Sequence, residues 1–366
     1  MAKPKATEFH FDERAAKIAI LFFERLLKHY KGEWAGQLFA LPAWQKKIIS
    51  DIFGWKRADG TRKYRTAYVE VPRKNGKSTM AAGIALEMLF LDDEPGSEVY
   101  SAAADREQAA IVFDTAKQMV VQSAQLSDRS KAFRRSIAVP EGSRKYEVLS
   151  SDVPTKHGLN AHAILFDELH AQPNRDLWDV LTTSTGSRRQ PLTFAMTTAG
   201  YDRESICWEQ HEYARQVING VIDDPSFYAV IYAADESDDW TDERIWAKAN
   251  PNLDVSIKRD YLRAECKKAL ATPAYQNTFR RLHLNQWTQQ DERWLPLEKW
   301  DEGGKPFDIA QLEGKRCYGG LDLASTSDIA AFVLDFQLED EHHYWLPTFW
   351  IPEENMIERA RRDRVP

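Results

Sequence analysis

Up to about residue 205, the apolar positions follow two patterns, the spacing of amphipathic helices and the short runs of strands. From Asp12 to about Tyr30 the apolar residues recur at helical spacing, and a second helix is expected after Pro42. The face of the first helix is formed by Ile18, Leu21, Phe22, Leu26 and Leu27. Short apolar and β-branched runs predict strands at 67–71, 98–102, 163–166 and 192–197, with helices at 79–90 and 105–121. This alternation predicts a parallel sheet of the α/β class.

The pattern changes after residue 205. To about residue 290 it is mainly helical, and Gly and Pro residues near positions 296 and 303–306 indicate a linker. Strand patterns then follow at 316–322, 329–336 and 344–351, which is typical of an antiparallel hairpin that opens another domain. We therefore expect a first domain at 1–205, a helical lid or linker at 206–300, and an incomplete domain at 310–366.

A candidate phosphate-binding loop spans 71–78, between a predicted strand and a predicted helix. It matches the pattern G-x-x-x-x-G-K-[ST] except at its first position, where Val71 replaces glycine. Gly76 permits the loop to turn, Lys77 supplies charge to the phosphates, and the Ser78 hydroxyl is suited to Mg²⁺. The residues expected to contact ATP here are Arg73, Lys74, Asn75, Gly76, Lys77, Ser78 and Thr79. The alternative is a basic surface turn.

Two adjacent carboxylates, Asp167 and Glu168, follow the apolar strand at 163–166. Ligands of parallel sheets bind at the carboxyl ends of the strands, which places this pair beside the loop. Asp167 is suited to hold Mg²⁺ with its water shell, and Glu168 to deprotonate the attacking water. Such a pair alone often only caps a helix. Together with the loop, it predicts an NTPase.

Charge and cysteine content add little to this picture. The net charge of −7 gives no general sign of nucleic-acid binding, so any such contact must come from a local basic patch. One candidate patch comprises Arg129, Lys131, Arg134, Arg135, Arg144 and Lys145, unless it is only a solvated face. Three widely spaced cysteines argue against a disulfide framework, and no apolar run is long enough for a membrane span, so we expect an intracellular protein.

Several segments together resemble the large terminase subunit of tailed bacteriophages. They are Leu41–Gln45, the loop with its arginine, Asp167–His170, Thr197–Gly200 and Phe279–Trp287. The resemblance implies that Gln45 reads the adenine edge and that Thr197 and Thr198 sense the γ-phosphate and relay hydrolysis to DNA movement. It also implies a P-loop NTPase fold with ATP and Mg²⁺ as cofactors. The partners would be the backbone of double-stranded DNA, the portal protein, the small terminase subunit and sister subunits in a ring, in the cytoplasm of an infected bacterium.

The segment from Gly319 to Asp328 resembles the first strand of the ribonuclease-H-like terminase nuclease. There Asp322 would bind Mg²⁺ or Mn²⁺ for two-metal cleavage. Asp328 is a second candidate ligand, and the alternative is that it only caps a turn. Because the further carboxylates of the family lie beyond residue 366, we expect this chain alone not to cut DNA.

Hydrolysis also needs an arginine at the transferring phosphoryl group, and Arg73 is one candidate. The family can supply another in trans, but Thr155–Gly158 contains no arginine, which leaves Arg129 and Arg144 as alternatives. Two rival functions remain open. One is a helicase-like ATPase, and the other is an adaptor for DNA binding or capsid assembly that does not hydrolyse ATP.

Overall fold

The computed structural model describes residues 8–104, 106–149, 158–288, 302–304, 306–323, 330–338 and 342–350. The chain forms two compact units, Met1–Trp294 and Leu295–Pro366, and each is described by itself. In the described residues, no helix is long and apolar enough to cross a membrane.

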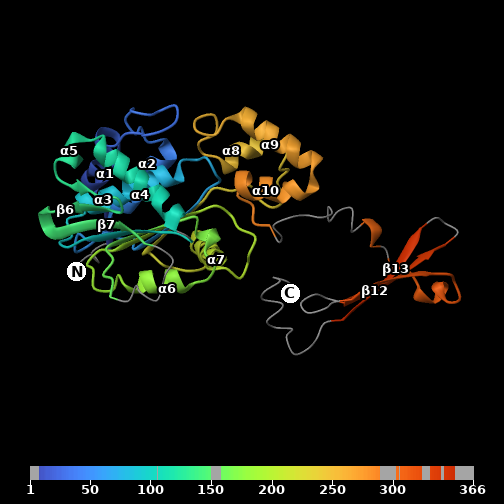
Figure 1. Ribbon diagram of the computed structural model, residues 1–366. Helices are drawn as coiled ribbons and strands as arrows, with labels where there is room; N and C mark the ends of the chain where they lie inside the picture. Colours follow the sequence, from blue (N-terminus) through green and yellow to red (C-terminus); the bar gives the residue numbers. More distant parts are fainter. Residues whose placement is uncertain are drawn as a thin grey trace, which may run out of the picture. The chain divides into compact units, whose positions relative to one another are not determined.

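A mainly parallel sheet forms the centre of the first unit (Figure 1). Among the described residues it has eight strands, which are, in sheet order, β10 (Phe227–Ile231), β3 (Thr66–Glu70), β9 (Leu192–Thr197), β8 (Ala163–Asp167), β4 (Glu98–Ala102), β7 (Arg144–Val148), β6 (Ser136–Val139) and β5 (Lys131–Ala132). All neighbours from β10 to β7 are parallel, and only β6 and β5 are antiparallel additions at one edge. The predicted parallel α/β sheet is confirmed.

Helices cover both faces of this sheet, because successive side chains of each strand point to opposite faces. Ala67 and Val69 of β3 pack into one apolar cluster, whereas Tyr68 belongs to the cluster on the other face. The first cluster includes residues of α1 (Glu13–Leu26), α2 (Ala43–Gly54), α3 (Lys77–Phe90), α4 (Arg106–Val121) and α5 (Ala124–Ser127). The second includes residues of α6 (Asp176–Thr183) and α7 (Ile206–Ile218). A short antiparallel pair of strands, β1 (Phe9–Phe11) and β2 (Trp55–Arg57), lies outside the main sheet.

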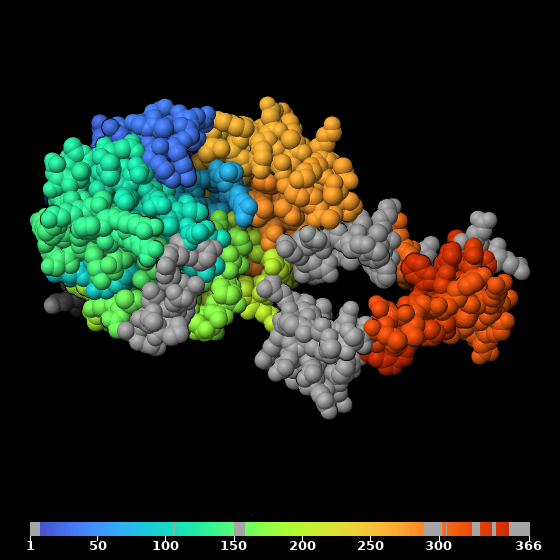
Figure 2. Space-filling view, in the orientation of Figure 1, coloured from blue at the N-terminus to red at the C-terminus, as the bar shows by residue number. Residues whose placement is uncertain are grey.

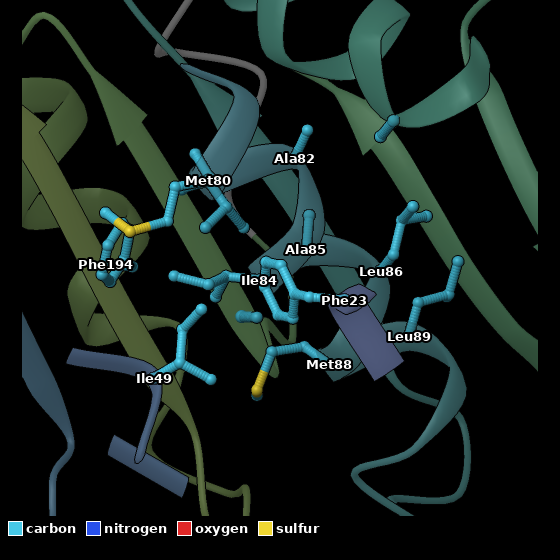
Figure 3. Packing of buried hydrophobic residues seen from close by; sticks show 14 of the residues in the cluster. Phe23, Ile49, Met80, Ala82, Ile84, Ala85, Leu86, Met88, Leu89 and Phe194 are labelled. Atoms are coloured by element: carbon cyan, nitrogen blue, oxygen red, sulfur yellow. The ribbon is translucent and has the colours of Figure 1, made fainter. Parts of the chain in front are cut away.

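Helix α3 lies in the middle of the core and is buried along almost its whole length (Figure 3). The ring of Phe23 from α1 packs directly on it, and a Cβ atom added at Gly83 would come 2.1 Å from that ring. Glycine at this position therefore sets how closely the two helices approach. The predicted face of α1 was wrong in part, because Ile18 and Leu21 are exposed. Phe23, which the prediction left out, is fully buried instead.

The region from residue 206 to 288 is only partly helical. It contains α7 and a separate apolar cluster built from α8 (Glu243–Ala249), α9 (Arg259–Ala271) and α10 (Pro273–Leu284). These three helices, gold to orange in Figure 2, lie against the blue N-terminal part of the unit, where Lys258 forms an ion pair with Glu33. The prediction missed β10, which lies between α7 and α8 and extends the main sheet beside β3. A five-residue edge strand between helices gives little periodic signal.

The second unit contains the predicted antiparallel strands. In the described residues these are β11 (Tyr318–Asp322), β12 (Ala330–Gln337) and β13 (His343–Trp350), paired in that order. Asp335 on β12 accepts a hydrogen bond from the His343 ring on β13 at 2.9 Å.

Candidate active site

Three neighbouring strands of the central sheet deliver the predicted catalytic residues to one edge. The phosphate loop follows β3, Asp167 ends β8, and Thr197 ends β9. Because β9 lies between β3 and β8 in a parallel arrangement, all three carboxyl ends meet there. This is the edge of a parallel sheet at which ligands bind.

The phosphate loop has the backbone that an anion-binding turn requires. Gly76 has a φ of 83° immediately before α3, a left-handed conformation that glycine adopts without strain, and Lys74 is left-handed with a φ of 69°. The N-terminus of α3 therefore points into the loop with its positive end. Val71, at the position where the pattern has glycine, is fully buried, and its N–H donates to the carbonyl of Thr197 at 3.1 Å. Valine is tolerated because that position continues the strand pairing.

Lys77 connects the loop to the ends of the two other strands. Its Nζ donates to the Thr198 hydroxyl at 2.7 Å and to the Val71 carbonyl at 3.1 Å, and it lies 3.8 Å from Glu168 Oε1. The Thr198 hydroxyl in turn donates to Glu168 Oε2 at 3.4 Å. The structure thus brings the predicted lysine, threonine and glutamate into one contact network. Lys77 is almost completely buried, so its charge acts in a poorly hydrated site.

A hydroxyl and a carboxylate meet beside this network. Ser78 Oγ donates to Asp167 Oδ2 at 3.0 Å, and Asp167 is buried. Burial raises the pKa of Asp167 to about 6, and the neighbouring charge of Glu168 contributes in the same direction. A bound cation would favour the ionised form. Oxygen ligands of this kind are those that Mg²⁺ prefers, so the residues fit the predicted metal site.

The Glu168 side chain projects from a strained main chain. With a φ of 50° it is left-handed although it is not glycine, and its N–H donates to Asp167 Oδ1 at 3.1 Å. Burial acts to raise the pKa of Glu168, but Lys77 first, and then His170, Arg73 and the hydrogen bond from Thr198, outweigh it and bring the pKa below its usual value. Arg73 itself is exposed, and its main-chain N–H donates to the Leu282 carbonyl at 3.0 Å. Glu168 is therefore held ionised, as a base requires.

Gln45 of α2 lies against the loop. It is 1% exposed, and a Cβ atom added at Gly76 would lie 3.4 Å from its Nε2 atom. In the described part of the chain, the buried Oε1 atom of Gln45 has no hydrogen-bond partner. Because an unpaired buried oxygen is costly, this atom fits a donor from a bound ligand. The prediction that Gln45 is near the nucleotide is compatible with this position.

The connection between α8 and α9 holds the loop from the other side. Asn75 Nδ2 donates to Asn250 Oδ1 at 2.9 Å, and Asn75 Oδ1 accepts from the Asn252 N–H at 3.0 Å. Ser256 Oγ donates to the Lys74 carbonyl at 2.6 Å. The two asparagines from the helical region were not identified from the sequence. Their only signal is the polar Asn-Pro-Asn turn at 250–252.

Comparison with known proteins identifies this arrangement. The family model for the ATPase domain of the terminase large subunit matches residues 43–216, and the model for its endonuclease domain matches residues 221–365. The chain belongs to the terminase large subunit family. The endonuclease match begins before β10, so it includes α8–α10, which lie in the first compact unit of this terminase subunit.

Individual relatives agree with this assignment. The chain is 29% identical over 356 residues to the terminase large subunit of Enterobacteria phage HK97, covering 95% of this chain and 67% of the relative. It is 32% identical over 200 residues to protein YmfN of Escherichia coli K12, covering 53% of this chain and 44% of the relative. The crystal structure of the HK97 large terminase superimposes with a TM-score of 0.65 at 26% identity, covering 96% of this chain and 71% of that one. The chain thus spans from under half to about two thirds of the length of these two curated relatives.

Two residues after α10 bind the loop that follows β9. Asn285 Oδ1 accepts from the Ala199 N–H at 2.7 Å, and the Trp287 ring packs on Gly200, where an added Cβ atom would come within 2.9 Å of it. Trp287 Nε1 also donates to the buried Glu70 carboxylate at 3.2 Å. The sequence resemblance included this segment but assigned no role to either residue.

The two alternative arginine fingers, Arg144 and Arg129, differ in burial. Arg144 is buried and donates to the main-chain carbonyls of Glu141 and Phe90, so it is a structural residue and not a free finger. Arg129 is exposed and pairs with Glu141 at 2.9 Å, and Lys145 pairs with Glu147. Of the expected basic patch, Lys131 on β5 and Arg134 and Arg135 in the turn after it are exposed. Residues 155–157 of the trans-finger segment lie outside the described residues.

Asp322 is the last residue of β11 in the second unit and is exposed. Among the described residues no group of three or more His, Cys, Asp or Glu side chains is arranged to hold a metal ion. Asp328 lies outside the described part of the chain. Asp322 lies in the segment that resembles the first strand of the nuclease, and its role as a metal ligand stays a prediction.

Proposed function

We propose that this chain is the motor of a DNA-packaging terminase and hydrolyses ATP to move double-stranded DNA into a phage capsid. The observation that carries the proposal is the convergence of Lys77, Thr198 and Glu168 within hydrogen-bonding or ion-pair distance, beside the Ser78–Asp167 pair. A phosphate-binding lysine, a magnesium-binding pair and a base at one sheet edge form a complete set of groups for phosphoryl transfer to water.

Each residue has a defined role in this proposal. The loop N–H groups and Lys77 bind the β- and γ-phosphates, and the exposed Arg73 stabilises the charge on the transferring group. Ser78 and Asp167 would hold Mg²⁺, which supplies positive charge to the phosphate oxygens. Glu168 takes the proton of the attacking water, because its ionised carboxylate faces the same space as Lys77. Gln45 would accept a hydrogen bond from the exocyclic amine of adenine.

Thr197 and Thr198 would relay hydrolysis to the rest of the motor. Thr198 contacts both Lys77 and Glu168, so loss of the γ-phosphate changes its surroundings directly. Thr197 is buried at the end of β9, and its hydroxyl donates to the Thr198 carbonyl at 3.0 Å. A packaging motor should contact the DNA backbone without reading bases. By family membership the further partners would be the portal protein, the small terminase subunit and sister subunits.

We place the end of the motor domain after β10 and not at residue 205, because β10 is hydrogen-bonded to β3 in the central sheet. The helical region α8–α10 then acts as the lid, since it binds the phosphate loop through Asn250 and Asn252. The second unit would be the start of the endonuclease, with Asp322 as a ligand for Mg²⁺ or Mn²⁺.

The test of the motor is steady-state ATP hydrolysis with and without linear duplex DNA, for the wild type and Glu168→Gln. We expect DNA to stimulate the wild type, and the variant to lose at least about a hundredfold in kcat while it still binds ATP. Exposed Glu107→Gln serves as the matched control. Equal rates for the wild type and Glu168→Gln would remove the proposed base. Unwinding of a forked duplex would favour a helicase, and ATP binding without hydrolysis would favour an adaptor.

A further inference from the structure

The contacts of His170 carry an inference about how the base is oriented. Glu168 has no short, directional hydrogen bond of its own, because its contacts to Lys77 and Thr198 measure 3.8 and 3.4 Å. A carboxylate that must face one water molecule needs more orientation than these distances give. His170 Nδ1 lies 3.3 Å from Glu168 Oε2 and is the third polar contact of this side chain in the described residues.

His170 is itself fixed to the end of β9. Its main-chain N–H donates to Thr197 Oγ1 at 3.1 Å, and its ring Nδ1 lies 3.1 Å from the same oxygen. The Thr197 hydroxyl donates to the Thr198 carbonyl at 3.0 Å, so its oxygen is left to accept from His170. The imidazole therefore stands between the proposed base and the first threonine of the relay.

The tautomer of the ring follows from these neighbours. A neutral imidazole carries one N–H, and a lone pair at Nδ1 would face both the Glu168 carboxylate and the Thr197 oxygen. With the proton on Nδ1 the ring donates to Thr197 Oγ1, and the same N–H lies beside the Glu168 oxygen 3.3 Å away, which is a favourable contact. Burial lowers the pKa of His170 to about 4, although the Glu168 charge acts to raise it, so the ring donates without adding charge beside the base. A lysine or arginine there would stabilise the ionised base and weaken it.

We infer that His170 is a positioning residue for hydrolysis, whose Nδ1–H orients the Glu168 carboxylate and ties it to Thr197 at the end of β9. This inference rests on the proposed function, because it takes Glu168 as the base. His170 does not contact the phosphate loop in the described residues, so it acts through Glu168 and not on the nucleotide.

The experiment compares kcat and KM for ATP in the full chain with His170→Ala, His170→Asn and His170→Gln. We expect His170→Ala to lower kcat about ten- to a hundredfold with KM changed less than about twofold, because a hydrogen bond to a charged group is lost. Asparagine places its amide nitrogen where Nδ1 stood, so His170→Asn should recover most of the rate. Glutamine places its amide nitrogen one carbon farther out, so His170→Gln should not recover the rate. Exposed His10→Asn is the matched control.

A double substitution separates orientation from mere packing. In the Glu168→Gln background the base is absent, so adding His170→Ala should change the residual rate less than about twofold. A purely structural histidine would lower that rate further and would lower the unfolding temperature of all three variants alike. If His170→Ala hydrolyses ATP like the wild type while Glu168→Gln does not, the inference fails and the motor stands. If the wild type is no faster than Glu168→Gln, both fail.

Discussion

Glu87 should make the first unit less stable as the pH rises. The side chain projects from α3 into the core and is 5% exposed, and its Oε2 atom has no hydrogen-bond partner in the described residues. Burial raises its pKa to about 8, with the charge of Asp92 acting in the same direction and the charges of Arg62 and Lys56 opposing. The folded protein therefore keeps a proton that the unfolded chain releases near pH 4.5.

The sign and size follow from this difference in proton binding. Between pH 4.5 and 8 the folded state holds more protons, so stability must fall as pH rises through that window. At about 1.4 kcal/mol per pH unit, the loss between pH 5 and 8 is on the order of 3 kcal/mol. Asp92 does not interfere, because burial is outweighed by Arg62 and its pKa is lowered to about 2, outside this range.

The measurement is urea unfolding of the wild type and Glu87→Gln at several pH values from 5 to 8. Because other titrating groups are common to both proteins, the difference in unfolding free energy isolates Glu87. We expect the unfolding free energy of Glu87→Gln, relative to that of the wild type, to increase steadily as the pH rises. Exposed Glu107→Gln should show no such trend. Parallel curves for Glu87→Gln and the wild type would mean that the carboxyl is ionised in the fold and that this reasoning is wrong.

Three further substitutions test packing, base recognition and the segment after α10. Gly83→Ala should lower stability by about 1–3 kcal/mol in urea unfolding, since the new methyl group overlaps the Phe23 ring, and a neutral result would mean that the helices can separate. Gln45→Ala should weaken ATP binding about tenfold but leave GTP binding nearly unchanged, which competition binding would show. Trp287→Phe should cost about 1.5–3 kcal/mol, because Glu70 loses a buried donor; unchanged stability would contradict that bond.

The catalytic loops were predictable from the sequence because their chemistry depends on local order along the chain. A strand, a glycine, a lysine and a hydroxyl must follow one another for the loop to form, and Asp167 and Glu168 are adjacent. The same holds for β4 and β9, whose observed bounds equal the predicted ones, since both are short, buried and mainly apolar or β-branched segments.

Contacts between distant segments were not predictable. Asn75 and Asn250 are 175 positions apart, and nothing in either neighbourhood indicates that their side chains meet. The last two strands at one end of the sheet, β6 and the edge strand β5, are short and partly exposed, so their pattern is too weak to separate from a loop. Arg144 shows the opposite error, because a charged residue in a basic run was assigned to the surface although its guanidinium binds buried carbonyls. Charge patterns reveal composition, whereas burial depends on the fold.

The connections around β9 suggest where the energy of hydrolysis can go first. Thr198 contacts the groups that handle the γ-phosphate, and the next residue, Ala199, donates to Asn285 at 2.7 Å. Asn285 in turn donates to the Tyr232 carbonyl just after β10, and Trp287 packs on Gly200. Because an N–H···O bond weakens beyond about 3.2 Å, a shift of Thr198 and Ala199 by more than about half an ångström would either break the 2.7 Å bond to Asn285 or carry Asn285 with it. Leaving that buried bond unmade costs about 1–3 kcal/mol, so we expect residues 285–288 to move together with the sensing threonine.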